Sequence, residues 1–109
     1  MFGEKLPRRA KETISRFGKR LRREYADAQV YLFGSYADGT WIEDSDFDIV
    51  VVSNRFEGQA FAERVAAVRH LAPKNEPFEI LAYTPAEFRK AMRRSIVIQD
   101  ARRYWRRIL

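Results

Sequence analysis

Two aspartates, Asp46 and Asp48, stand at the start of the most apolar segment of the chain, which reads FDIVVV. Side chains alternate between the two faces of a strand, so both carboxylates project to one face, about 7 Å apart. Carboxylates at this spacing repel each other, and one of them tends to stay protonated unless a cation joins them. Mg²⁺ accepts a few carboxylates together with water and phosphate oxygens. The pair therefore predicts a magnesium site, and two such ions can assist an in-line phosphoryl displacement.

A Gly-Ser pair, Gly34-Ser35, lies upstream of these aspartates, separated from them by residues 36–45. Glycine lets backbone amides come close to a ligand, and a short helix starting near Ser35 would direct N–H groups at an anion. The Ser35 hydroxyl can also donate a hydrogen bond. The pair predicts phosphate contacts opposite the metal ligands.

A third acidic residue, Glu79, lies inside the apolar run FEILAY. A glutamate among apolar neighbours is costly unless it is paired or bound to a metal. Two interpretations stay open. Glu79 can pair with an arginine, or it can face the same way as Asp46 and Asp48 if its strand lies beside theirs.

The strands that must position these residues follow from apolar runs. We expect strands over residues 28–33, 47–53 and 78–83. The apolar run after Asp48 is continuous, which is typical of a strand buried on both faces. A loop is expected over residues 54–58.

The expected helices cover residues 6–25 and 59–71, then a segment from a capping box at Thr84 to residue 95, and finally the segment 96–109. This order predicts an α/β fold in which helices pack on a small mixed sheet of about three to four strands. We expect one domain, 1–109. The residues expected to face inward from the second and last helices are Phe61, Val65, Val68, Leu71, Val97, Ala101, Tyr104 and Ile108.

Charge is distributed unevenly along a chain whose net charge is +6. Residues 1–25 hold 9 Lys and Arg against 3 acids, residues 26–88 hold 4 against 11, and residues 89–109 hold 8 against 1. The acidic centre argues against a plain nucleic-acid-binding domain. The basic helices are either solvated faces or a surface for an acidic partner or a nucleic-acid acceptor. Tyr104 and Trp105, among arginines, can stack on a base or pack in the core.

Several functional classes are excluded by composition. The chain has no cysteine and a single histidine, His70, so thiolate zinc sites, disulfides and a Ser-His-Asp triad cannot be assembled. No apolar run approaches the roughly 20 residues of a membrane span. The start, MFGEKLPRRAKE, lacks the apolar centre of a signal peptide. We expect a cytoplasmic protein with no membrane contact, and its small core makes a homo- or hetero-oligomer a natural supplement.

The spacing Gly34-Ser35, ten residues, Asp46-Phe47-Asp48, followed by Glu79 in a later strand, resembles the signature of the DNA polymerase beta-like nucleotidyltransferases. The small size resembles their minimal nucleotidyltransferase (MNT) group, and the resemblance covers nearly the whole chain. It implies that Asp46 and Asp48 bind two Mg²⁺ ions when an NTP is bound. It also implies that Glu79 binds the catalytic ion and helps to activate the attacking hydroxyl, while Gly34 and Ser35 hold the β- and γ-phosphates. The implied reaction moves a nucleotidyl group from an NTP, with ATP the expected one, to a hydroxyl of a protein or RNA and releases pyrophosphate.

The resemblance also frames a rival interpretation. Many minimal members carry a basic residue directly after Gly-Ser, where this chain has Tyr36. Such proteins are commonly encoded beside a HEPN-domain protein, and some act as antitoxins. The alternative function is therefore a binding module that neutralises a HEPN-type partner mainly by complex formation.

Overall fold

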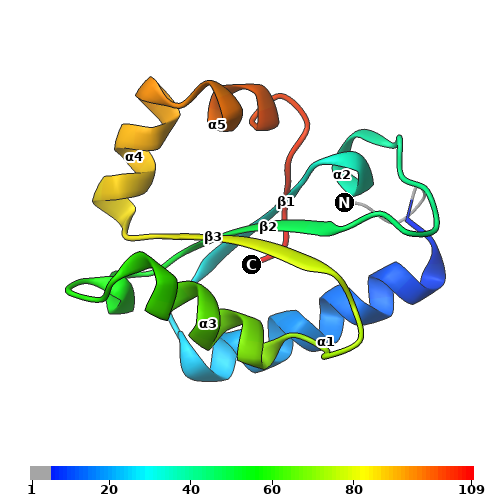
Figure 1. Cartoon of the computed structure of the whole chain (residues 1–109), viewed down its shortest axis with the longest axis horizontal. Coiled ribbons are helices and arrows are strands. Elements are labelled where there is room, and N and C mark those ends of the chain that lie inside the picture. Colours follow the sequence, from blue (N-terminus) through cyan, green and yellow to red (C-terminus); the bar gives the residue numbers. More distant parts are fainter. Residues whose placement is uncertain (1–5) are drawn as a thin grey trace.

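A computed structural model describes residues 6–109. The elements of this part of the chain are, in order, α1 (Arg8–Glu24), β1 (Gln29–Phe33), α2 (Ser35–Asp38), β2 (Phe47–Val52), the 3₁₀ turn η1 (Asn54–Phe56), α3 (Phe61–Leu71), β3 (Phe78–Tyr83), α4 (Pro85–Arg94), α5 (Ile96–Ala101) and β4 (Arg106–Arg107). Their course is shown in Figure 1. Among these residues, no helix is both long and apolar enough to cross a membrane.

The strands form one sheet in the order β3-β2-β1-β4. Strand β1 runs antiparallel to β2 and β4, whereas β2 and β3 are parallel, so the sheet is mixed as the sequence predicts. In the central strand, Ile49, Val50 and Val51 are fully buried, which confirms that β2 is covered on both faces.

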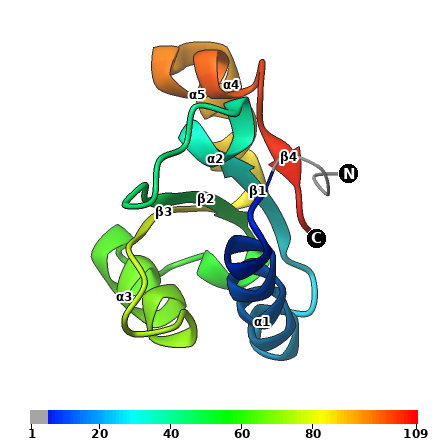
Figure 2. The same ribbon diagram turned by 90° about the vertical axis from the view of Figure 1, so that its right-hand side faces the viewer.

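The sheet lies between two layers of helices (Figure 2). On one side α1 and α3 cover the larger core, to which α1 contributes Ile14, Phe17 and Leu21 at helical spacing. On the other side α4 and α5 cover a smaller apolar cluster around Val50 and Phe88. Strand alternation places Asp48 on this second face, together with Val50. The second face is therefore apolar at one end and acidic at the other.

The start of α4 forms as its sequence predicts. The Thr84 hydroxyl accepts a hydrogen bond from the Glu87 N–H at 3.2 Å, and the Glu87 carboxylate accepts one from the Thr84 N–H at 2.9 Å. Pro85 occupies the first helical position, where a missing N–H costs nothing. This capping box fixes where β3 ends and α4 begins.

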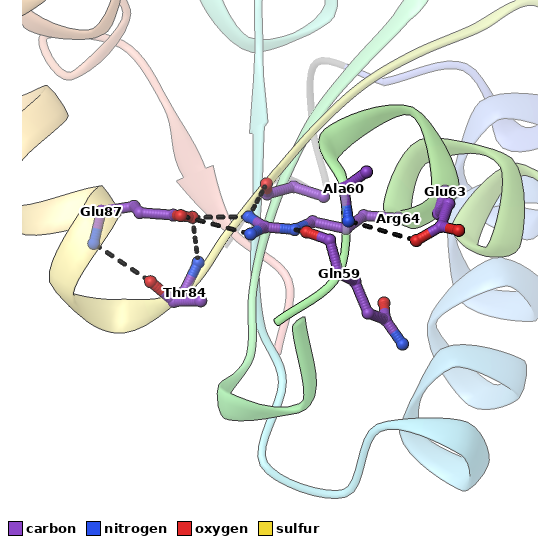
Figure 3. A network of polar contacts seen from close by, with 7 residues as sticks. Gln59, Ala60, Glu63, Arg64, Thr84 and Glu87 are labelled. Carbon is purple, nitrogen blue, oxygen red and sulfur yellow. Dashed lines mark hydrogen bonds and ion pairs between the residues drawn. The ribbon is translucent and has the colours of Figure 1, made fainter. Parts of the chain in front are cut away.

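A buried arginine ties α3 to β3 and α4 (Figure 3). Arg64 donates to the Gln59 carbonyl at 2.9 Å, to the Ala82 carbonyl at 3.2 Å and to both oxygens of Glu87. These hydrogen bonds hold the pKa of Glu87 below its ordinary value. One turn further along α3, Arg69 donates to the carbonyl of Phe78. Two guanidinium groups thus attach α3 to the backbone of β3.

The inward face expected for α3 is partly wrong. Phe61 is 46% exposed and only touches the ring of Tyr83, with ring centroids 6.5 Å apart. Val68 is buried as expected, while Val65 and Leu71 pack half-buried against the core. The reason is that Arg64 takes a buried position to reach Glu87, which turns the first turn of α3 toward solvent.

The expected helix over residues 96–109 is also wrong beyond Ala101. The chain turns there, and Arg106–Arg107 pair with β1 as the edge strand β4. Val97 is 63% exposed and Tyr104 is 48% exposed, whereas Ile98 is buried. Trp105 accounts for the change, because its ring packs on Tyr31, with centroids 4.7 Å apart, and draws the chain back to the sheet.

Candidate active site

The central feature of the site is the register of the parallel strands β2 and β3. Asp48 lies directly opposite Glu79, so the condition for Glu79 to face the same way as Asp48 is met. Neighbouring strands lie about 4.8 Å apart, and both side chains leave the sheet on the face that carries α4 and α5. The ion pairs of residues 6–109 are Arg9–Glu76 and Arg64–Glu87, so the arginine partner considered for Glu79 is not found there.

Asp48 is electrostatically strained in this arrangement. Its half-buried position, together with the negative charges of Glu79 and Asp46, raises the pKa of its carboxyl to about 6. No basic side chain of residues 6–109 forms an ion pair with these carboxylates, so they repel one another. Perturbed carboxyl groups of this kind are typical of functional sites.

Gly34 brings the Gly-Ser turn into contact with Asp48. Its backbone has φ +73°, and a Cβ at this position would lie 1.9 Å from Asp48 Oδ2. Only glycine fits such a position, because any side chain would occupy the space of the carboxylate. The antiparallel register of β1 and β2, which pairs Phe33 with Asp48, sets this approach.

The short helix expected near Ser35 is present as α2. The N–H groups of Ala37 and Asp38 both donate to the Gly34 carbonyl at 3.0 Å. The first N–H groups of a helix have no intrahelical acceptor, so those at the start of α2 are directed outward from the turn. The helix is closed by Gly39, whose φ of 90° matches a left-handed C-cap.

Asp46 lies exposed immediately before β2, close enough for its charge to act on Asp48. The loop that carries it is held by a hydrogen bond from the Ile42 N–H to the Ser45 hydroxyl at 2.8 Å. Within residues 6–109, no three acidic or histidine side chains stand close enough together to hold a metal ion as they are placed here. The donor set itself, carboxylate oxygens only, is the set that Mg²⁺ prefers.

Tyr36 has a structural position. It is buried on the side away from Asp48 and stacks on Phe47, with centroids 4.6 Å apart, and on Trp41 at 6.1 Å. The departure from the family motif therefore places an aromatic ring in the core. Trp41, in the loop before β2, packs against this ring.

Other polar residues near the sheet lie outside the cluster. Glu43 and Asp44 are exposed in the loop before β2. His70 is exposed in the last turn of α3, and this helix covers the opposite face of the sheet (Figure 2).

Comparison with known proteins adds a family to this geometry. The family model described as "Nucleotidyltransferase domain" matches residues 14–104. A crystal structure of a "putative nucleotidyltransferase" is 26% identical and superposes with a TM-score of 0.60 over 93% of this chain and 98% of that one. A "putative nucleotidyltransferase from Sulfolobus solfataricus" is 24% identical, with a TM-score of 0.54 over 81% of this chain and 85% of its own, and shows the shared fold. No curated protein matches.

A different kind of protein also shares part of the arrangement. BolA1 from Arabidopsis thaliana is 26% identical, with a TM-score of 0.54 over 69% of this chain and 94% of that one. Fold likeness at this level is thus not specific to one activity. The assignment depends on the family model and on the first structure.

The fold and the acidic site define a nucleotidyltransferase of the polymerase beta-like, minimal type. The chain belongs to the nucleotidyltransferase domain family, which confirms the resemblance read from its motif and supports a transferase that uses an NTP.

Sequence reasoning missed one part of the neighbourhood. Val97 and Tyr104 line a cavity beside Gly34, although their spacing suggested core positions. The helix ends before Tyr104 because the ring of Trp105 packs on Tyr31 in the sheet. The helical spacing of Val97 and Tyr104 could not show this, since the packing of Trp105 is a tertiary contact.

Proposed function

We propose that the chain, 1–109, acts as one nucleotidyltransferase domain that moves a nucleotidyl group from Mg²⁺-bound ATP to a hydroxyl of a protein or RNA. Asp46, Asp48 and Glu79 hold the metal, and Gly34 and Ser35 hold the β- and γ-phosphates. The oxygen of the acceptor attacks the α-phosphorus, the bond to the bridging oxygen breaks, and pyrophosphate leaves.

The observation that carries this proposal is the meeting of three strand ends at one carboxylate. Asp48 has Glu79 beside it in register and the backbone of Gly34 against it. Metal ligands and a phosphate-binding turn are thereby brought within one small area. The carboxylates of Asp48 and Glu79 do not stabilise the fold by their proximity, because their like charges repel each other.

Each residue has a distinct task in this scheme. Asp48 is the central ligand, because it is the half-buried carboxylate and the one raised in pKa. Asp46 and Glu79 are exposed and can rotate toward it. In this proposal Glu79 also accepts the proton of the attacking hydroxyl. Bound Mg²⁺ would supply positive charge to the phosphate oxygens.

Calorimetric titration with ATP, with and without Mg²⁺, tests the proposal. Binding is expected in the presence of Mg²⁺ and is expected to disappear in the Asp46→Asn, Asp48→Asn double variant. If the folded protein binds ATP under neither condition, the proposal is wrong. Repeating the titration with the other three NTPs tests the preference for ATP.

The finer expectations about partners and location stay predictions. They are a HEPN-type partner, a nucleic-acid acceptor bound through the basic helices, and a cytoplasmic location. The double variant discriminates the rival function, because a binding module would neutralise its partner with both aspartates replaced.

A further inference from the structure

A cavity of about 390 Å³ lies beside the acidic site, between α5, α2 and the end of β1. Figure 1 and Figure 2 both place α5 above the sheet next to α2, on the face that carries Asp48. The volume falls within the range of about 300–1,000 Å³ that is usual for small-molecule sites. The cavity is therefore large enough for part of a nucleotide.

The outer wall of the cavity is apolar and exposed. Ile96 is 81% exposed, Val97 63% and Tyr104 48%, and all three line the cavity. Ile98 fixes α5 to the sheet from its other side, since it is fully buried. Single exposed apolar residues are ordinary, but three around one hollow are typical of a binding surface.

The cavity is continuous with the phosphate end of the proposed site. Gly34 lines it and also packs against the Asp48 carboxylate. A ligand whose phosphates lie at Gly34 and Ser35 would reach the cavity with the groups bonded next to them. Because the cavity is continuous with the Gly34–Ser35 turn, it is suited to hold the rest of the ligand whose phosphates lie at that turn.

The charges on the lining favour a neutral group in the cavity. Asp38 and Asp100 both contribute to its surface, and their carboxylates would repel a further phosphate. Carboxylates accept hydrogen bonds from the N–H groups of a nucleobase. Tyr104 offers an aromatic ring, and the Arg103 guanidinium lies 5.5 Å from its centroid. Such a ring with a neighbouring cation suits base stacking.

We propose that this cavity holds the nucleoside part of the incoming NTP, with the base stacked on Tyr104 and packed against Val97. This placement rests on the proposed function, because it assumes phosphates at Gly34 and Ser35. A second cavity, of about 690 Å³, borders the loop before β2, but none of Gly34, Ser35, Asp48 and Glu79 lines it.

The test separates the base from the phosphates by using two ligands, ATP and inorganic tripolyphosphate, each with Mg²⁺. Calorimetric affinities are measured for the whole chain and for the Tyr104→Ala and Val97→Asp variants. Phe61→Ala is the matched control, because Phe61 is an aromatic residue of similar exposure, 46%, outside the cavity lining. Thermal unfolding verifies that each variant is folded.

We expect Tyr104→Ala to weaken ATP binding by about tenfold, the usual range for a lost stacking contact. Val97→Asp should weaken ATP binding as well, and neither variant should change the affinity for tripolyphosphate. The Phe61→Ala variant should bind both ligands like the unmodified chain.

Four outcomes would overturn the placement. If both variants bind ATP with unchanged affinity, the base lies elsewhere, and the proposed function still stands. If they lose ATP and tripolyphosphate equally, the residues act on the phosphate end or the fold. If the unmodified chain binds neither ligand, the proposed function fails together with this inference. Loss of self-association in Val97→Asp with unchanged ATP affinity would assign the surface to a second copy instead.

Discussion

Two charged clusters lie at opposite ends of β3, and they are balanced in opposite ways. At the far end, Arg64 is buried among acceptors, and its charge meets the Glu87 carboxylate and two carbonyls. At the near end, Glu79 lies beside Asp48, with the charge of Asp46 added and no arginine paired to any of them within residues 6–109. The first cluster stabilises the fold. The second opposes folding through the repulsion of like charges, and perturbed carboxyl groups of this kind are typical of functional sites.

The largest effect is expected from a substitution in the acidic cluster of Asp46, Asp48 and Glu79. Asp48→Asn should lower the Mg²⁺-dependent affinity for ATP by about 100-fold or more, because it removes the proposed central metal ligand. At neutral pH the metal-free variant should unfold at higher denaturant than the unmodified chain, since the repulsion with Glu79 is gone. Calorimetry and urea denaturation measure the two effects. Asp44→Asn, in the exposed loop nearby, is the control and should change neither.

The next largest effect is expected from a substitution in the paired cluster of Arg64 and Glu87. Arg64→Met should lower the free energy of unfolding by about 2–3 kcal/mol, because the Ala82 carbonyl and Glu87 lose a buried charged donor. The matched control is Arg9→Met, whose ion pair with Glu76 joins a side chain that is 70% exposed. Exposed pairs contribute about 0–1 kcal/mol. Equal losses in urea denaturation would contradict the contrast between the two arginines.

A smaller effect tests the contact between Gly34 and Asp48. Gly39 has left-handed backbone angles, where alanine costs about 1–2 kcal/mol, whereas Gly34, with φ 73° and ψ −155°, lies in a region that is essentially restricted to glycine. Only at Gly34 would the new Cβ meet the carboxylate, at 1.9 Å, whereas Gly39 has open space around it. Gly34→Ala should therefore cost about 1–3 kcal/mol more than Gly39→Ala. It should also weaken ATP binding, and Gly39→Ala should not.

The smallest effect is a difference in pH dependence. The pKa of Asp48 is raised from 3.8 to about 6, so the folded protein binds this proton more tightly than the unfolded chain. The stability due to Asp48 is present below pH 3.8 and is lost as pH rises through about 6. Glu87, whose pKa is lowered, has the opposite sign, and its stability is lost as pH falls.

Urea denaturation of the metal-free protein at a series of pH values measures both contributions. Asp48→Asn should remove the loss of stability on the alkaline side of this window. Glu87→Gln should reduce the loss on the acid side. A pH profile that Asp48→Asn leaves unchanged would show that Asp48 is not strained in the folded protein.

The parts of the fold set by local sequence were predictable. The continuous run after Asp48 gave a buried central strand, and Thr84 with Glu87 gave a capping box. The fold class followed from the order of these elements. The motif residues were identifiable because their spacing along the chain is itself the signal.

The parts that depend on distant contacts were not predictable. The alignment of Asp48 with Glu79 requires β2 and β3 to be parallel neighbours. The sequence alone did not show which strands are neighbours. The edge strand β4 forms in place of the expected helix because Trp105 packs on Tyr31. The spacing of apolar residues along 96–109 gives no information on that contact. The approach of Gly34 to Asp48 depends on the register of β1.

The guanidinium groups that attach α3 to β3 also affect association between chains. The Pro77 and Tyr83 carbonyls bond to β2, so alternation turns the Phe78 and Ala82 carbonyls toward the outer edge of the sheet. Arg69 and Arg64 occupy those two acceptors. An edge strand with free acceptors is a template for strands of other molecules, and it leads to aggregation. Arg64 and Arg69 therefore hinder the addition of a further strand at the β3 edge. The opposite edge is formed by β4, which is only two residues long.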